Sequence, residues 1–175
     1  MNRRGFLKSS IVGTAVIGGA GIIAWHTVDP FTGDLSLTSS IHKLVTLDLG
    51  QTKSSGLWNV AQILNHCAQS VEYSMLGYPE HKSAFFKSTA GKLAFNAFKA
   101  KGRMRHNLSE EIPGADPLIA SANVEQAKRR FQTAMLVFAD FKGELAPHFA
   151  YGSLSKSEYE LAHVLHFNNH LQELT

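Results

Sequence analysis

Three histidines lie close together near the C-terminal end of the chain, in the run Leu161-Ala-His163-Val-Leu-His166-Phe-Asn-Asn-His170. If this run is an α-helix, His166 and His170 project from one side about 6 Å apart, with His163 one turn earlier on that side. Two neutral imidazoles placed in this way can bind one transition metal ion. The best further ligand in the sequence is His66, and three histidines from two helices would leave metal positions open to water or substrate. The alternative is that these are ordinary helix histidines that bind nothing.

A second polar pattern surrounds His66. Gln62, His66, Gln69 and Tyr73 follow one another at steps of four, three and four residues, which places them on one helical face. A helix that only needed to be soluble would carry Lys and Glu there, whereas amide, imidazole and phenol groups are typical of a cleft. We therefore expect Gln62, Gln69, Tyr73 and His163 to lie behind the metal ligands or to contact a substrate.

Apolar residues recur at three- and four-residue steps in four segments, and these segments must position the histidines. The pattern predicts helices over about 55–76, 82–101, 121–145 and 155–170, with Ser155 and Glu158 forming a capping box at the start of the last one. Residues 41–49 fit either a short helix or an extended arm. No long alternating run indicates a β-sheet, so we expect an all-α fold, a four-helix bundle, which builds metal sites from inward-facing side chains.

The first 29 residues differ from the rest of the chain. Arg3, Arg4 and Lys8 precede a stretch from Ser9 to Val28 without a formal charge. The start resembles a twin-arginine export signal, with Phe6 and Leu7 also matching and Asn2 departing from the usual Ser or Thr. No clean small-x-small cleavage site appears before Asp29, which favours a retained anchor over 1–29, and a cleaved signal is the other possibility. We expect a linker over 30–40 and one domain over 41–175. The alternative for 1–29 is a buried core helix.

Charge and cysteine content limit the choice of function. The formal charge of +3 falls to +1 without residues 1–29, which leaves 14 basic and 13 acidic side chains. Nucleic-acid binding thereby loses its main electrostatic support. Cys67 is the single cysteine, so the domain has no intrachain disulfide and must be stabilised by its core. We expect Cys67 to be a buried core residue, the alternative being a reactive thiol or one that joins a homodimer.

Taken together, the spacing of these motifs resembles a domain-of-unknown-function branch of the DinB-like (YfiT-like) superfamily. The resemblance covers residues 40–175 and depends on Trp58, Gln62, His66, Gln69, Ser70, Tyr73, Gly77 and Pro79, on Ile112-Pro-Gly, on Phe149, Gly152 and Leu154, and on the three late histidines. It implies a four-helix bundle with one divalent metal ion, nickel or zinc, bound by His66, His166 and His170. It gives His163 no fixed role, and some relatives are hydrolases or thiol-dependent transferases.

Two classes of function follow. The first is an exported, periplasmic or periplasm-facing metal-dependent hydrolase or thiol-dependent transferase that acts on a small molecule, with Glu110 or Glu111 as base if their loop folds over the site. The second is a non-catalytic envelope protein that binds metal or a partner. A metal with an exchangeable water would favour the first class, and a metal saturated by four protein ligands would favour the second. In both classes the twin-arginine machinery is the expected export partner.

Overall fold

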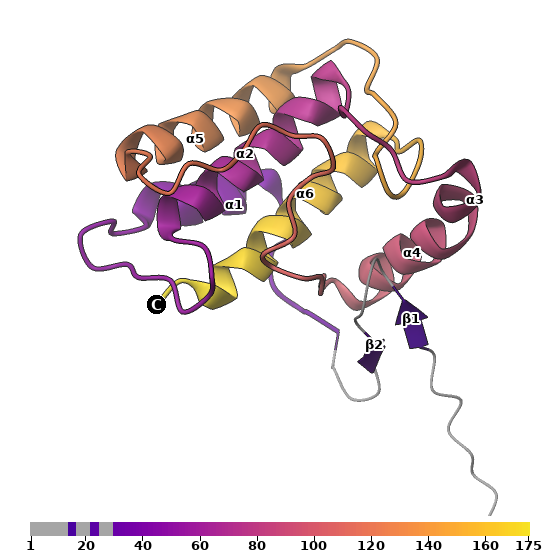
Figure 1. The fold of residues 1–175 in the computed structure, drawn as a ribbon, viewed down its shortest axis with the longest axis horizontal. Helices are drawn as coiled ribbons and strands as arrows, with labels where there is room; N and C mark the ends of the chain where they lie inside the picture. Colours follow the sequence, from indigo (N-terminus) through magenta and orange to yellow (C-terminus); the bar gives the residue numbers. More distant parts are fainter. Residues whose placement is uncertain (1–13, 17–21, 25–29) are drawn as a thin grey trace, which may run out of the picture.

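The computed structural model describes residues 14–16, 22–24 and 30–175 of the chain. Its elements, in chain order, are β1 (Thr14–Val16), β2 (Ile22–Ala24), α1 (Leu37–Thr46), α2 (Val60–Leu76), α3 (Ala84–Phe86), the π-helical turn η1 (Lys87–Gly91), α4 (Lys92–Lys101), α5 (Val124–Asp140), α6 (Lys156–His170) and the 3₁₀ turn η2 (Leu171–Glu173). The two short strands pair antiparallel and precede the helices (Figure 1). From residue 30 onward the described elements are helical, as the sequence predicts.

The predicted export segment falls mostly outside the described residues, so a signal or anchor over 1–29 stays a prediction. No helix in the described part of the chain is long and apolar enough to cross a membrane. The folded core begins before residue 41, where the domain was expected to start. Ser36 caps α1, and the first residue of that helix, Leu37, is buried.

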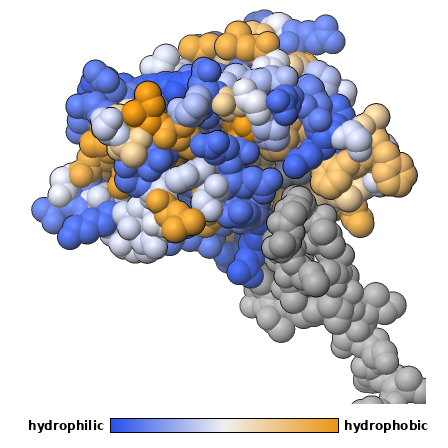
Figure 2. All heavy atoms as spheres, in the orientation of Figure 1, coloured by the Kyte–Doolittle hydropathy of each residue, from blue (hydrophilic) through white to orange (hydrophobic). Residues whose placement is uncertain are grey.

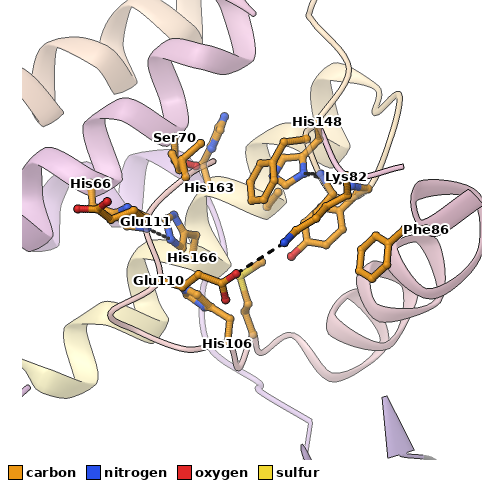
Figure 3. Close-up of a pocket in the computed structure, with 16 residues that line it drawn as sticks. His66, Ser70, Lys82, Phe86, His106, Glu110, Glu111, His148, His163 and His166 are labelled. Carbon is orange, nitrogen blue, oxygen red and sulfur yellow. Dashed lines mark hydrogen bonds and ion pairs between the residues drawn. The ribbon is translucent and has the colours of Figure 1, made fainter. Parts of the chain in front are cut away.

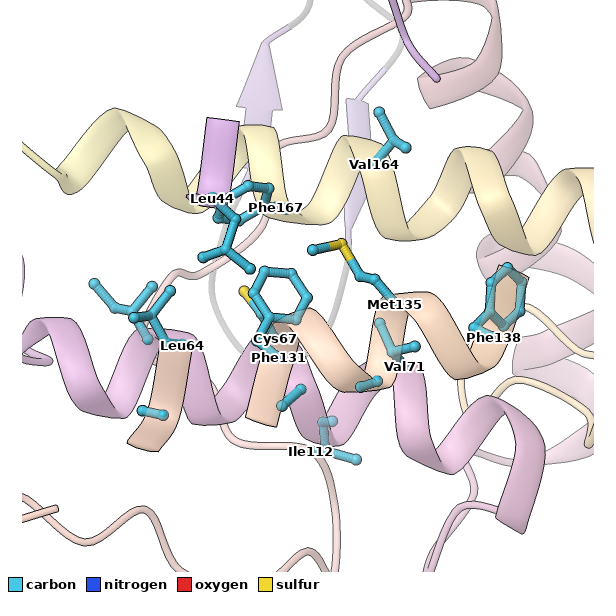
Figure 4. Close-up of a cluster of buried hydrophobic side chains, with 14 of the residues drawn as sticks. Leu44, Leu64, Cys67, Val71, Ile112, Phe131, Met135, Phe138, Val164 and Phe167 are labelled. Atoms are coloured by element: carbon cyan, nitrogen blue, oxygen red, sulfur yellow. The ribbon is translucent and has the colours of Figure 1, made fainter. Parts of the chain in front are cut away.

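One main hydrophobic core lies between α1, α2, α5 and α6, which pack against one another (Figures 1 and 4). Its largest fully buried side chains include Leu44, Leu64, Phe131, Phe138 and Phe167. Each helix contributes residues at three- and four-residue spacing, so an apolar stripe on each faces the same interior. This packing fixes α2 and α6, the two helices that carry the predicted metal ligands.

The segment expected as one helix over 82–101 consists of α3, η1 and α4, and it packs at the side of the main core through a smaller cluster. Residues 41–49, by contrast, contribute to the main core, because Leu44 of α1 is completely buried. The π-turn ends at Gly91, where a Cβ atom would overlap the carbonyl oxygen of Ala150. Glycine thus allows this helical segment to approach the loop before α6 closely.

Apolar side chains are exposed over α3 and the start of α4 (Figure 2). Phe85 is 78% exposed and Leu93 is 66% exposed.

Capping boxes begin the two helices that carry the predicted metal ligands. Ser155 and Glu158 form the predicted capping box of α6, and Asn59 forms an equivalent box with Gln62 at the start of α2.

Candidate metal centre

His66, His166 and His170 meet in the interior, where α2 packs against α6. The Nε2 atom of His166 lies 3.1 Å from Nε2 of His66 and 3.2 Å from Nε2 of His170. The one-turn spacing of His166 and His170 on α6 places both rings on the side that faces His66. The three residues named by the sequence are therefore brought together by the fold.

The two close contacts of His166 Nε2 cannot both be hydrogen bonds. A neutral imidazole nitrogen carries either one hydrogen or one in-plane lone pair. His166 Nε2 can therefore donate to one neighbouring Nε2 or accept from one, and its other close contact is left without a hydrogen bond. A metal ion between the three nitrogens would accept all three lone pairs at once, so the geometry favours a bound cation.

The spacing of the nitrogens agrees with such an ion. Two imidazole nitrogens bound at about 2.0–2.1 Å are separated by about 2.9 Å in octahedral and about 3.3 Å in tetrahedral geometry. The observed separations of 3.1 and 3.2 Å lie between these limits. Trp58 covers one side of the cluster, with its ring centroid 4.9 Å from that of His66 and 6.2 Å from that of His170.

A fourth histidine, His106, joins the cluster from the loop after α4. One ligand atom from each of the four residues lies within 4.8 Å of the others. The His106 backbone N–H donates to Asn169 Oδ1 at 3.3 Å, and its Nδ1 lies 3.0 Å from the same oxygen. An amide oxygen can only accept, so His106 Nδ1 carries the proton and Nε2 presents a lone pair. That Nε2 atom is buried and has no hydrogen-bond partner among the described residues.

Burial keeps these imidazoles neutral, which is the form that binds metal. Desolvation, followed by the charge of His106, lowers the pKa of His66 to about 3. Desolvation also lowers the pKa of His106 to about 4, although its hydrogen bond with Asn169 opposes this, and that of His170 to about 2. The pKa of His166 is lowered well below its usual value by burial and by the other histidines. At neutral pH the cluster is therefore an uncharged set of nitrogen donors.

A cavity of about 80 Å³ opens beside the cluster (Figure 3). His66, His106 and His166 line it, whereas His170 is not among the described residues of its lining. The loop that carries Glu110 and Glu111 reaches the site, because both residues also line the cavity. Figure 3 shows these two carboxylates on the side of the histidines, with Lys82 and His148 toward the opposite end. Lys82 Nζ lies 3.9 Å from Glu110 Oε1.

His163 lines the same cavity but is not part of the histidine cluster. Ser74 donates its hydroxyl proton to the Val71 carbonyl, so its oxygen accepts from His163 Nε2–H at 3.2 Å. The His163 ring also stacks on Tyr159 at 5.4 Å. Burial, followed by the charge of Lys156, lowers the pKa of His163 to about 3. His163, one turn before His166 on α6, is therefore a neutral residue in the wall of the cavity.

The polar side chains of α2 at Gln62, Gln69 and Tyr73 make their contacts outside the cavity. Gln62 Nε2 donates to the Leu118 carbonyl at 3.2 Å, and Gln69 Nε2 donates to the Asp116 carbonyl at 2.8 Å. Tyr73 packs its ring 5.9 Å from that of Tyr78. None of these three side chains is among the described residues that line the cavity. Through these two part-buried hydrogen bonds the amides hold the loop that carries His106 against α2.

Cys67 is buried in the main core next to His66, as expected, and burial raises the pKa of its thiol. His106 is a candidate ligand that the sequence did not indicate. It lies in an irregular segment between helices, where no periodic pattern indicates which way a side chain points.

Residues 34–175 match a protein family described as "Protein of unknown function (DUF1569)". No curated protein and no solved structure matches the chain significantly.

Proposed function

The chain belongs to the DUF1569 family, and we propose that it binds one divalent metal ion, nickel or zinc, through His66, His166 and His170, with His106 as a further ligand. The observation that carries the proposal is the convergence of three Nε2 atoms at 3.1 and 3.2 Å, which no arrangement of imidazole protons satisfies. Imidazole nitrogen suits both metals. The likeness of the histidine spacing to DinB-like proteins supports the same ligands and a DinB-like four-helix bundle.

The proposed activity is that of a metal-dependent hydrolase or thiol-dependent transferase acting on a small molecule. A bound divalent ion would lower the pKa of a coordinated water or thiol toward neutrality. Glu110 and Glu111 line the cavity on the side of the histidines and can take up a proton there. The lining also includes the apolar side chains of Phe86 and Ile112, and apolar walls that limit the access of water strengthen electrostatic interactions at a reacting centre.

A second function is favoured by His106. If all four histidines bind a tetrahedral ion, no coordination position is left for water, and the centre is structural or stores metal in the envelope. Five- or six-coordinate binding keeps positions open toward the cavity that His66, His106 and His166 line. The visible spectrum of the cobalt-substituted protein distinguishes these cases, because tetrahedral and higher-coordinate cobalt absorb with very different intensity.

Metal content of the full-length protein tests the site. We expect about one equivalent of metal per chain after reconstitution and a clear loss in His166→Ala. His42→Ala is the matched control, because His42 is exposed on α1 and does not belong to the cluster. A His166→Ala protein that retains the full equivalent, or a wild-type protein that takes up none from nickel, zinc or cobalt, would overturn the proposal.

We further propose that the protein is exported in its folded state by the twin-arginine machinery and faces the periplasm. Arg3, Arg4, Phe6, Leu7 and Lys8 support this proposal. Export after folding suits a protein that acquires its metal before crossing the membrane. Cell fractionation of the wild type beside the double variant Arg3→Lys, Arg4→Lys tests it, and equal amounts of both proteins in the periplasmic or membrane fraction would contradict it.

A further inference from the structure

His148 lies at the end of the cavity opposite the histidine cluster, in a tight turn before α6 (Figure 3). Its backbone N–H donates to Gly152 O at 2.8 Å, and the Gly152 N–H donates back at 3.1 Å. The ring is held between two aromatic neighbours, with centroid distances of 4.2 Å to Tyr151 and 4.6 Å to Phe149. The orientation of the imidazole is therefore fixed by packing as well as by the turn.

The hydrogen bonds of His148 also fix its tautomer. Nδ1 lies 3.1 Å from the backbone nitrogen of Ala150 and 3.2 Å from that of Tyr151, and it must accept from both. Burial, followed by the charges of His163 and His81, lowers the pKa of His148 well below its usual value, so the ring is neutral. Its one proton is then on Nε2. No residue in the described part of the chain is hydrogen-bonded to that N–H, which leaves it for a ligand in the cavity.

Lys82 is the second donor at this end. Its backbone N–H donates to the Phe149 carbonyl at 2.9 Å, so the segment before α3 is attached directly to the His148 turn. Its ammonium group reaches the cavity and is only weakly engaged by Glu110, at 3.9 Å. Two donors from two joined segments thus face the same space, and a ligand that carries acceptor oxygens is the chemistry they recognise.

The charge of the cavity indicates what kind of acceptor fits. Glu110, Glu111 and Lys82 are the charged residues among those that line it, so the described lining carries one net negative charge without a metal. A divalent ion at the four neutral histidines changes that net charge to one positive. A ligand with a single negative charge then neutralises the site. The volume of about 80 Å³ is well below the roughly 150 Å³ that holds benzene, so only a group of a few heavy atoms fits inside.

We infer that this cavity binds a small monocarboxylate, whose carboxylate oxygens accept hydrogen bonds from His148 Nε2–H and from the Lys82 ammonium group. The inference rests on the proposed function, because the metal ion supplies the charge that offsets Glu110 and Glu111. It assigns the substrate of the centre to small carboxylic acids or to molecules that carry one such group. Both residues are binding residues that contact the ligand.

Acetate is the probe, and acetamide is its neutral counterpart of the same shape. Saturation-transfer difference NMR on the full-length, zinc-reconstituted protein reports binding of both without any need for turnover. We expect acetate to bind more tightly than acetamide and its dissociation constant to rise about tenfold or more in His148→Asn and in Lys82→Met. An asparagine side chain can still accept from the backbone N–H groups of the turn but places no donor where Nε2 lies.

The controls separate this inference from the metal site. Lys87→Met removes a neighbouring lysine that does not line the cavity and should leave acetate binding unchanged. Metal content should stay at about one equivalent in every variant, because none of the three residues is a ligand. Equal acetate affinity in the wild type, His148→Asn and Lys82→Met, with metal bound, would overturn the inference and leave the metal site intact. Acetate binding that depends on His148 in a chain that takes up no metal would overturn the metal site instead, and failure of both measurements would overturn both.

Discussion

Replacing Asn169 by alanine is expected to weaken metal binding about 10- to 100-fold, although Asn169 is not itself a ligand. Its Oδ1 atom faces His106 Nδ1 at 3.0 Å and the His106 backbone nitrogen at 3.3 Å. Two hydrogen bonds of about 0.5–1.5 kcal/mol each hold the ring with Nε2 toward the cluster. Losing both costs about 1–3 kcal/mol, which is about 5- to 150-fold in the dissociation constant and agrees with the effect of outer-shell changes at other metal sites.

Trp58 provides the assay, because its ring lies 4.9 Å from His66 and a bound nickel or cobalt ion should quench its fluorescence. Trp25→Phe removes the other tryptophan of the chain and serves as the background for all variants. Titration against a competing chelator then gives the dissociation constant. Asn168→Ala is the matched control, since the neighbouring Asn168 accepts from Lys43 Nζ at 3.0 Å rather than from His106.

Asn169→Asp completes the test, because a carboxylate accepts the same two hydrogen bonds and makes the imidazole a better donor to a metal. We expect its affinity to equal or exceed that of the wild type. Equal affinities for Asn169→Ala and Asn168→Ala, with thermal unfolding of the metal-free proteins unchanged, would refute the assignment of His106 as an oriented ligand. The centre would then have the three ligands that the sequence indicates.

Three further outcomes are expected. In the metal-free protein the pKa of His163 is about 3 in the folded state and about 6.5 in the unfolded state. Between these pH values protons bind preferentially to the unfolded chain. The free energy of unfolding should therefore fall as the pH drops from 6.5 toward 3, and His163 alone should contribute about 1.4 kcal/mol per pH unit. His163→Phe should show a correspondingly shallower slope in urea unfolding at pH 5–7, and an identical slope would contradict this. Gly91→Ala should destabilise the protein by about 1–3 kcal/mol or more, because the new Cβ would overlap the Ala150 carbonyl. Gly50→Ala is the control and should change stability little, because its Cβ would meet only the Asp48 side chain at 3.3 Å. Equal urea midpoints for the two variants would count against the close packing of η1. Cys67 is buried and its pKa is raised, so its reaction with a thiol reagent should proceed only at the rate of unfolding, and rapid labelling of the native protein would show an accessible thiol.

The helices could be predicted because their signals are local. Apolar spacing, the Ser155 cap and the four-residue step from His166 to His170 act within one or two turns of backbone. The same local geometry explains why His66 could be placed on a helix face. Local helix geometry did not show that α1 joins the main core while the segment of α3 and α4 packs beside that core. The position of each helix depends on which apolar faces meet in the folded chain.

The polar side chains of α2 show what helical periodicity leaves undecided. Gln62 and Gln69 share a face with His66 on a helical wheel, but they donate to loop carbonyls at Leu118 and Asp116. A helix face about 100° wide borders more than one neighbour, so residues on one stripe need not reach one cavity. The path of the loop decides which neighbour each glutamine contacts. Loops have no periodic sequence pattern from which that path could be predicted.

Residue spacing was enough to predict an all-α domain and three histidines on two helices, because helix geometry converts spacing into direction over short distances. Three other features arise only when the helices and loops pack together. Nε2 atoms from α2 and α6 meet at 3.1 Å, His106 enters from a loop and is oriented by Asn169, and His148 and Lys82 line the same cavity. Each of these features joins residues distant along the chain. Their separation in space is set by core packing and by the hydrogen-bond demands of buried loop backbone, which act between segments and leave no local pattern.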